Sequence, residues 1–84
     1  MRTLNEFDRL SVSAHLVDAR GKACPAPIIE LAKALRAHAE VELWADDPAA
    51  RADLDAFVAA TGHVLALVDG ATRHLRAVVR RGAM

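Results

Sequence analysis

Loop and helix-end residues at Arg20 and Gly21, at residues 46–48, at Gly62, and at Asp69 and Gly70 divide the chain into apolar segments, and this division constrains the fold most. Glycine, proline and aspartate at these positions are typical of loops and helix ends. Four of the segments are apolar stretches of five to nine residues, and two longer ones have helical spacing. The order of the segments predicts a β-α-β-α-β-β chain.

Four apolar stretches are predicted to be strands. They cover residues 14–19, 41–45, 63–68 and 72–80. Asp69 and Gly70 separate the last two stretches and are typical of a tight hairpin. In the final stretch Leu75, Ala77 and Val79 are expected to face the core, while His74, Arg76 and Arg80 face outward.

Two segments are predicted to be helices. The first opens at Cys24, with Pro25 in the first helical position, and runs to about His38, with Ile28, Leu31, Ala32 and Leu35 on one apolar face. The second is predicted to begin with Asp47 as N-cap and Pro48 in the first position, and to end at Gly62. Its apolar residues are Ala50, Leu54, Phe57 and Val58.

Right-handed β-α-β connections place both helices on the same face of the sheet. We therefore expect a two-layer α/β (α+β) sandwich, in which a four-stranded mixed sheet carries two helices on one face. The 84 residues indicate one domain at residues 14–80, preceded by a flexible leader at residues 1–13 and followed by a tail at residues 81–84.

Composition excludes several functional classes. The chain has 11 basic and 11 acidic residues, and this balance argues against direct nucleic-acid binding. No signal-peptide run begins the chain, and no apolar run approaches the roughly 18 residues of a membrane span, so the expected location is cytoplasmic, with no membrane partner. One cysteine allows neither an internal disulfide nor a resolving thiol.

Cys24 is the candidate reactive residue. At the N-cap of a helix its sulfur would face the positive end of the helix dipole, which lowers the thiol pKa and favours the nucleophilic thiolate. Arg20 and Lys22 would add positive potential, while Pro25 and Pro27 would stiffen the turn. No histidine is placed by a sequence signature to act as its base. Carrying a group such as a sulfane sulfur therefore fits this cysteine best.

Residues 17–27, VDARGKACPAP, resemble the signature of the TusA/SirA-like family, the CPxP sulfur carriers. Asp46, Asp47 and Pro48, followed by Asp53, Leu54 and Phe57, resemble a second block of these proteins. The resemblance covers residues 16–79. It implies that Cys24 accepts sulfur as a persulfide, and that the supporting motif residues are Asp18, Arg20, Gly21, Pro25 and Pro27.

The resemblance also implies partners. Sulfur would come from a cysteine desulfurase or a rhodanese and pass to a DsrE-like or other acceptor, in tRNA thiolation, molybdenum-cofactor assembly or sulfur oxidation. No cofactor is implied. Lys22, Ala26 and Val58 depart from the family pattern, so the identity of the partner stays open. The candidate docking residues are Lys22, Ala26, Arg73, Arg76 and Arg80.

Simpler interpretations compete with several of these assignments. Helix capping explains Asp46 and Asp47 better than acid-base chemistry does. The basic cluster on the last strand is also typical of an edge strand whose charges prevent aggregation. His15, His38, His63 and His74 lack metal-ligand spacing with Cys24, so no metal site is expected. Two other functions stay open: a regulatory or interaction module with a packed Cys24, and a thiol redox regulator.

Overall fold

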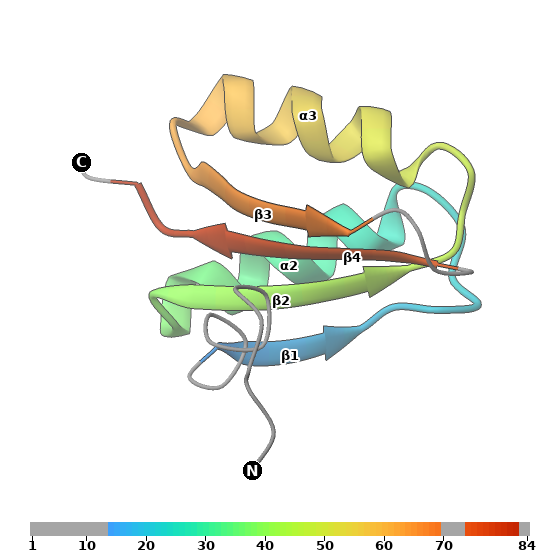
Figure 1. Ribbon diagram of the computed structural model, residues 1–84, viewed down its shortest axis with the longest axis horizontal. Coiled ribbons are helices and arrows are strands. Elements are labelled where there is room, and N and C mark those ends of the chain that lie inside the picture. Colours follow the sequence, from blue (N-terminus) through green and yellow to red (C-terminus); the bar gives the residue numbers. More distant parts are fainter. Residues whose placement is uncertain (1–13, 70–73, 83–84) are drawn as a thin grey trace, which may run out of the picture.

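The computed structural model describes residues 14–69 and 74–82 and confirms the predicted order of elements (Figure 1). Strands and helices follow one another as β1 (His15–Asp18), α2 (Ala26–Ala37), β2 (Glu40–Ala45), α3 (Ala50–Thr61), β3 (Val64–Asp69) and β4 (Leu75–Arg80). Arg73 and the predicted hairpin turn after Asp69 lie outside the described residues, as does the predicted leader at residues 1–13.

The four strands form one mixed sheet in the order β1-β2-β4-β3. β1 runs parallel to β2, and β4 is antiparallel to both β2 and β3. Two parallel neighbouring strands need a crossover connection between them. α2 is that connection for β1 and β2, and it packs on the sheet. Asp18 at the end of β1 pairs with Trp44 near the end of β2, so the loops after these two strands leave the same edge of the sheet.

Both helices cover one face of this sheet, as predicted. The core joins Leu31 and Leu35 of α2 and Leu54 of α3 to side chains from that face. The strand residues are alternate ones, as the two-residue period of a strand requires: Val41, Leu43, Ala77 and Val79. Burial of these side chains, each at 2% exposure or less, is the main force that holds the helices on the sheet.

The opposite face of the sheet carries charged and aromatic side chains. Glu42 is 5% exposed, and its carboxylate accepts hydrogen bonds from the Trp44 indole and from Arg76. Arg80 pairs with Glu40 at 3.0 Å. The predicted outward direction of Arg76 and Arg80 is confirmed, and both arginines have carboxylate partners there.

The helix starts differ from the prediction. The N-cap of α2 is Pro25, one residue after the cysteine, and Pro27 stands in the second helical position. The N-cap of α3 is Ala49, so Asp47 and Pro48 precede the helix and Asp47 is not its cap. The predicted end of α3 is confirmed, since Gly62 adopts the left-handed conformation with φ 80°.

Hydrogen bonds continue past the predicted domain end at residue 80. The Arg81 N–H donates to the Ala39 carbonyl at 2.7 Å, and the Gly82 N–H donates to His63 Nδ1 at 2.9 Å.

None of the helices in the described part of the chain is long and apolar enough to cross a membrane.

Candidate functional site at Cys24

Cys24 lies in the loop between β1 and α2 and is exposed. The loop between β2 and α3 lies beside it, because parallel strands β1 and β2 end at the same edge of the sheet. The cysteine is therefore surrounded by residues more than twenty positions further along the chain. Its peptide bond to Pro25 is cis.

Two consecutive aspartates of the second loop bind the backbone of the cysteine loop. Asp46 Oδ1 accepts the Gly21 N–H at 2.9 Å, and Asp47 Oδ2 accepts the Cys24 N–H at 3.2 Å. Asp47 Oδ1 also accepts the Ala49 N–H at 2.8 Å, which forms a turn ahead of α3. Neither aspartate is the N-cap of α3, which is Ala49, and the side chains of both join the two loops.

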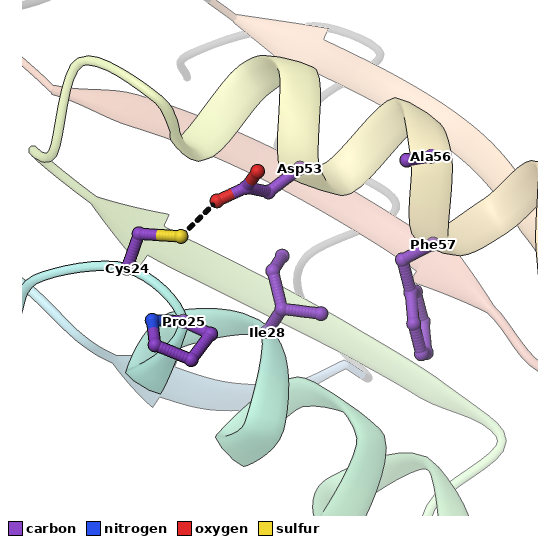
Figure 2. A pocket seen from close by; sticks show the side chains of 6 residues that line it. All are labelled: Cys24, Pro25, Ile28, Asp53, Ala56 and Phe57. Atoms are coloured by element: carbon purple, nitrogen blue, oxygen red, sulfur yellow. Dashed lines mark hydrogen bonds between the residues drawn. The ribbon is translucent and has the colours of Figure 1, made fainter.

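The thiol itself points toward α3. Cys24 Sγ lies 2.6 Å from Asp53 Oδ2, and Figure 2 shows the two side chains directed at each other. Asp53 stands in the first turn of α3, on the side that faces the cysteine loop. Sequence reasoning gave Asp53 a place in the family pattern and no chemical role. A signal for its role was available, because Asp53 is an acidic residue in the first turn of a helix that starts at the same sheet edge as the cysteine loop.

The structure overturns the predicted direction of the thiol pKa. The hydrogen bond to Asp53 raises the pKa of Cys24 above its usual value, with further contributions from partial desolvation and from the negative charges of Asp53 and Asp47. The helix dipole argument was wrong here because the carboxylate of Asp53 lies within hydrogen-bond distance of the sulfur. A carboxylate at this distance favours the protonated thiol over the thiolate.

The two basic residues of the loop are held by other carboxylates. Arg20 binds Asp18 through Nε and Nη2, at 2.9 and 2.7 Å, and these hydrogen bonds lower the pKa of Asp18 to about 2. Lys22 Nζ lies 2.8 Å from Glu30 of α2. Their positive charges are thus paired with carboxylates other than those that contact Cys24.

The supporting motif residues shape this loop. Gly21 has a φ of +82°, in the left-handed region that favours glycine, and its N–H is the one that Asp46 binds. The Arg20 guanidinium lies over the Trp44 ring, 4.8 Å from its centroid, and so ties the start of the loop to β2. Pro27 is buried at the start of α2.

A pocket of about 360 Å³ opens beside the sulfur (Figure 2). Its walls come from the start of α2 and from the facing side of α3. They consist of Cys24, Pro25, Ile28, Asp53, Ala56 and Phe57. Apart from the thiol and one carboxylate, the side chains that line it are apolar, so a reaction at Sγ would take place beside a low-dielectric surface.

The four candidate docking residues that the structure describes lie on different parts of the domain. Lys22 and Ala26 flank Cys24 in the chain, whereas Arg76 and Arg80 lie on the sheet face opposite the helices. Arg76 lies 5.7 Å from the Trp44 ring, near the sheet edge that carries the cysteine loop, and Arg80 lies at the other end of β4. Among residues 14–69 and 74–82, no cluster of three or more His, Cys, Asp or Glu could hold a metal ion.

Replacing Asp47 by alanine is expected to lower the free energy of unfolding by about 1–2 kcal/mol, because two backbone N–H groups lose a charged acceptor. Urea denaturation measures this loss, and hydrogen exchange of the Cys24 and Ala49 amides should accelerate locally. Asp55→Ala is the control, since Asp55 is exposed and pairs with Arg51 on the surface of α3. Equal stability of the Asp47 and Asp55 variants would contradict the bridging role.

Fold and site together define a small two-layer α+β domain that presents one cysteine from a Cys-Pro-x-Pro turn at a sheet edge. The family model described as "Sulfurtransferase TusA" matches residues 15–81, and the chain belongs to this family of sulfur-transfer proteins.

A curated relative, "Putative sulfur carrier protein YrkF" of Bacillus subtilis (strain 168), is 36% identical over 70 residues. The alignment covers 80% of this chain and 38% of that relative, so the chain spans well under half of the relative's length.

Proposed function

We propose that this protein is a sulfur carrier that accepts a sulfane sulfur on Cys24 as a persulfide and passes it to an acceptor protein. The observation that supports this most is the exposed Cys24 thiol beside an apolar pocket, on a loop whose backbone N–H groups are bound by Asp46 and Asp47, in a chain of the TusA sulfurtransferase family. These 84 residues contain no second cysteine, so no other thiol of this domain can take the cargo from Cys24.

The transfer balances without any cofactor. The Cys24 sulfur, as thiolate, attacks the outer sulfur of a donor persulfide, the donor S–S bond breaks, and the electron pair leaves with the donor cysteine as thiolate. The proton released by Cys24 goes to that thiolate through solvent. Attack of an acceptor thiolate on the outer sulfur of the Cys24 persulfide then repeats the step and restores the Cys24 thiol.

The donor in this proposal is a cysteine desulfurase or a rhodanese, both of which hold sulfur as a protein persulfide. The acceptor is a DsrE-like or other thiol protein in tRNA thiolation, molybdenum-cofactor assembly or sulfur oxidation. We place the carrier in the cytoplasm, where a lone reduced thiol persists. The partner enzymes supply turnover, and the carrier supplies the sulfur site.

The proposal is tested by intact mass spectrometry. The purified protein is mixed with a cysteine desulfurase and cysteine, and separately with a rhodanese and thiosulfate. We expect a gain of one sulfur atom with at least one donor, and loss of that gain on treatment with a reductant. No gain with either donor, while the donors load a control thiol, would contradict the proposal.

The raised pKa of Cys24 favours a second candidate, an interaction module that makes no use of the thiol. In such a module Cys24 would only be packed in the structure, yet it is exposed and borders a pocket. The same mass experiment separates the two candidates, since an interaction module would gain no sulfur.

A further inference from the structure

Negative groups surround the Cys24 thiol. The negative charges of Asp53 of α3 and Asp47 of the β2–α3 loop both act on the thiol. Asp46 accepts the Gly21 N–H of the cysteine loop. The basic groups of the loop are turned to other partners, Arg20 to Asp18 and Lys22 to Glu30. The carboxylate of Asp53 is the one in direct contact with the sulfur, at 2.6 Å.

We propose that Asp53 is a positioning residue that holds the unloaded Cys24 sulfur as a neutral thiol beside the apolar pocket and releases it once the sulfur is loaded. The inference rests on the proposed sulfur transfer at Cys24 and adds a role for a residue of a different element. In the empty carrier the Cys24 sulfur is hydrogen-bonded to Asp53, and in the loaded carrier this hydrogen bond is absent.

The contact requires a proton. A carboxylate has only acceptor oxygens, so a sulfur 2.6 Å from Asp53 Oδ2 must supply the hydrogen. A thiolate at this place would stand against a second negative charge beside apolar walls formed by Pro25, Ile28 and Phe57. Repulsion between the two negative charges disfavours the thiolate, so the neutral thiol is the favoured form here.

Asp53 stands at a helix start, a favourable place for an acidic side chain. It lies in the first turn of α3, where the positive end of the helix dipole favours a carboxylate. The exposed thiol of an empty carrier is thereby protected from unspecific electrophiles and oxidants, which react with thiolates. A docked donor that draws Asp53 away or neutralises it would free the thiolate for attack.

Loading removes the hydrogen bond. When Cys24 Sγ bonds to the transferred sulfur, its proton has been given up and Sγ has no hydrogen left to donate. The outer sulfur of a hydropersulfide is more acidic than a thiol, so it carries negative charge near neutral pH and is repelled by Asp53 and Asp47. The outer sulfur therefore turns away from α3, toward the side from which an acceptor thiol can approach.

The test is the pH dependence of Cys24 reactivity in Asp53→Asn. Asparagine keeps the size of the side chain and removes its charge, so we expect the midpoint of iodoacetamide alkylation to fall by about one pH unit or more. Thiolate would then be about tenfold more abundant at pH 7.5, and alkylation correspondingly faster. Thiolate absorbance in the ultraviolet gives the same midpoint independently.

Asp55→Asn is the matched control, because Asp55 lies on the same helix and pairs with Arg51 in solvent. Its midpoint should equal that of the wild type, and Asp53→Glu should restore a raised midpoint. If Asp53→Asn does not fold, the wild type alone decides the question: Cys24 should titrate at higher pH in the folded protein than in urea. A folded midpoint at or below the unfolded one would overturn the inference.

The sulfur-loading experiment, run on the same variants, separates this inference from the proposed function. If wild type gains sulfur while Asp53→Asn has an unchanged midpoint, the positioning role is overturned and the carrier function stands. If the midpoint falls as expected but no form of the protein gains sulfur, the carrier function fails. The proposed release of the sulfur on loading then fails as well, while the effect of Asp53 on the unloaded thiol stands.

Discussion

The Cys24→Ser variant is expected to remain folded and to gain no sulfur from either donor, a complete loss of the proposed activity. A serine hydroxyl is a far weaker nucleophile toward sulfur and cannot form a persulfide. Its O–H can still donate to Asp53, so the contact between the cysteine loop and α3 is preserved. Because Cys24 is exposed, stability should change by less than about 0.5 kcal/mol.

Intact mass spectrometry and urea denaturation of this variant are read together. A full-length mass without added sulfur, together with a wild-type unfolding midpoint, would assign the acceptor site to Cys24. A mass gain of one sulfur in Cys24→Ser would contradict the assignment, since the chain has no other cysteine to carry it.

Replacing Leu54 by alanine is expected to lower the free energy of unfolding by about 2–5 kcal/mol. Leu54 is fully buried and is the α3 side chain in the central core, against α2 and the sheet. Small domains have a total stability of about 5–15 kcal/mol, so this single cavity removes a large part of it. Because α3 carries Asp53, the loosened helix should also make Cys24 more reactive toward alkylation.

Urea denaturation measures the stability loss, with Leu16→Ala as the control. Leu16 is 46% exposed on β1, so the same chemical change leaves no buried cavity there. The account predicts a loss at Leu54 several times that at Leu16. Similar losses at the two positions would mean that α3 is not held on the sheet by the core described above.

The order of the elements could be predicted because local signals mark their boundaries. Gly62 closes α3 in the left-handed conformation, and alternate apolar residues in β4 face the core, as the sequence indicates. Which face the helices cover follows from the handedness of the crossovers, a rule that holds for any sequence of this order. The precise helix starts were missed because proline and aspartate fit several positions of a helix entry.

The cysteine was also found from the sequence, but its environment was not. Asp47 fits a helix cap by local rules, and one of its two partners, the Cys24 N–H, lies 23 residues earlier in the chain. Asp53 lies 29 residues after the sulfur that it contacts. Such pairs are brought together by the parallel alignment of β1 and β2, which no local pattern specifies. The predicted pKa direction was wrong because it included the helix dipole and left out this carboxylate.

The most direct test of the central claim is the release of the sulfur by cyanide. Mass alone is ambiguous, because a sulfinic acid adds two oxygens and nearly the same mass as one sulfur. The loaded protein is freed of donor and treated with cyanide, which takes a sulfane sulfur as thiocyanate and leaves the thiol. The account predicts one equivalent of thiocyanate and return to the unloaded mass. A mass gain that survives cyanide, with no thiocyanate formed, would show that Cys24 is oxidised and carries no transferable sulfur.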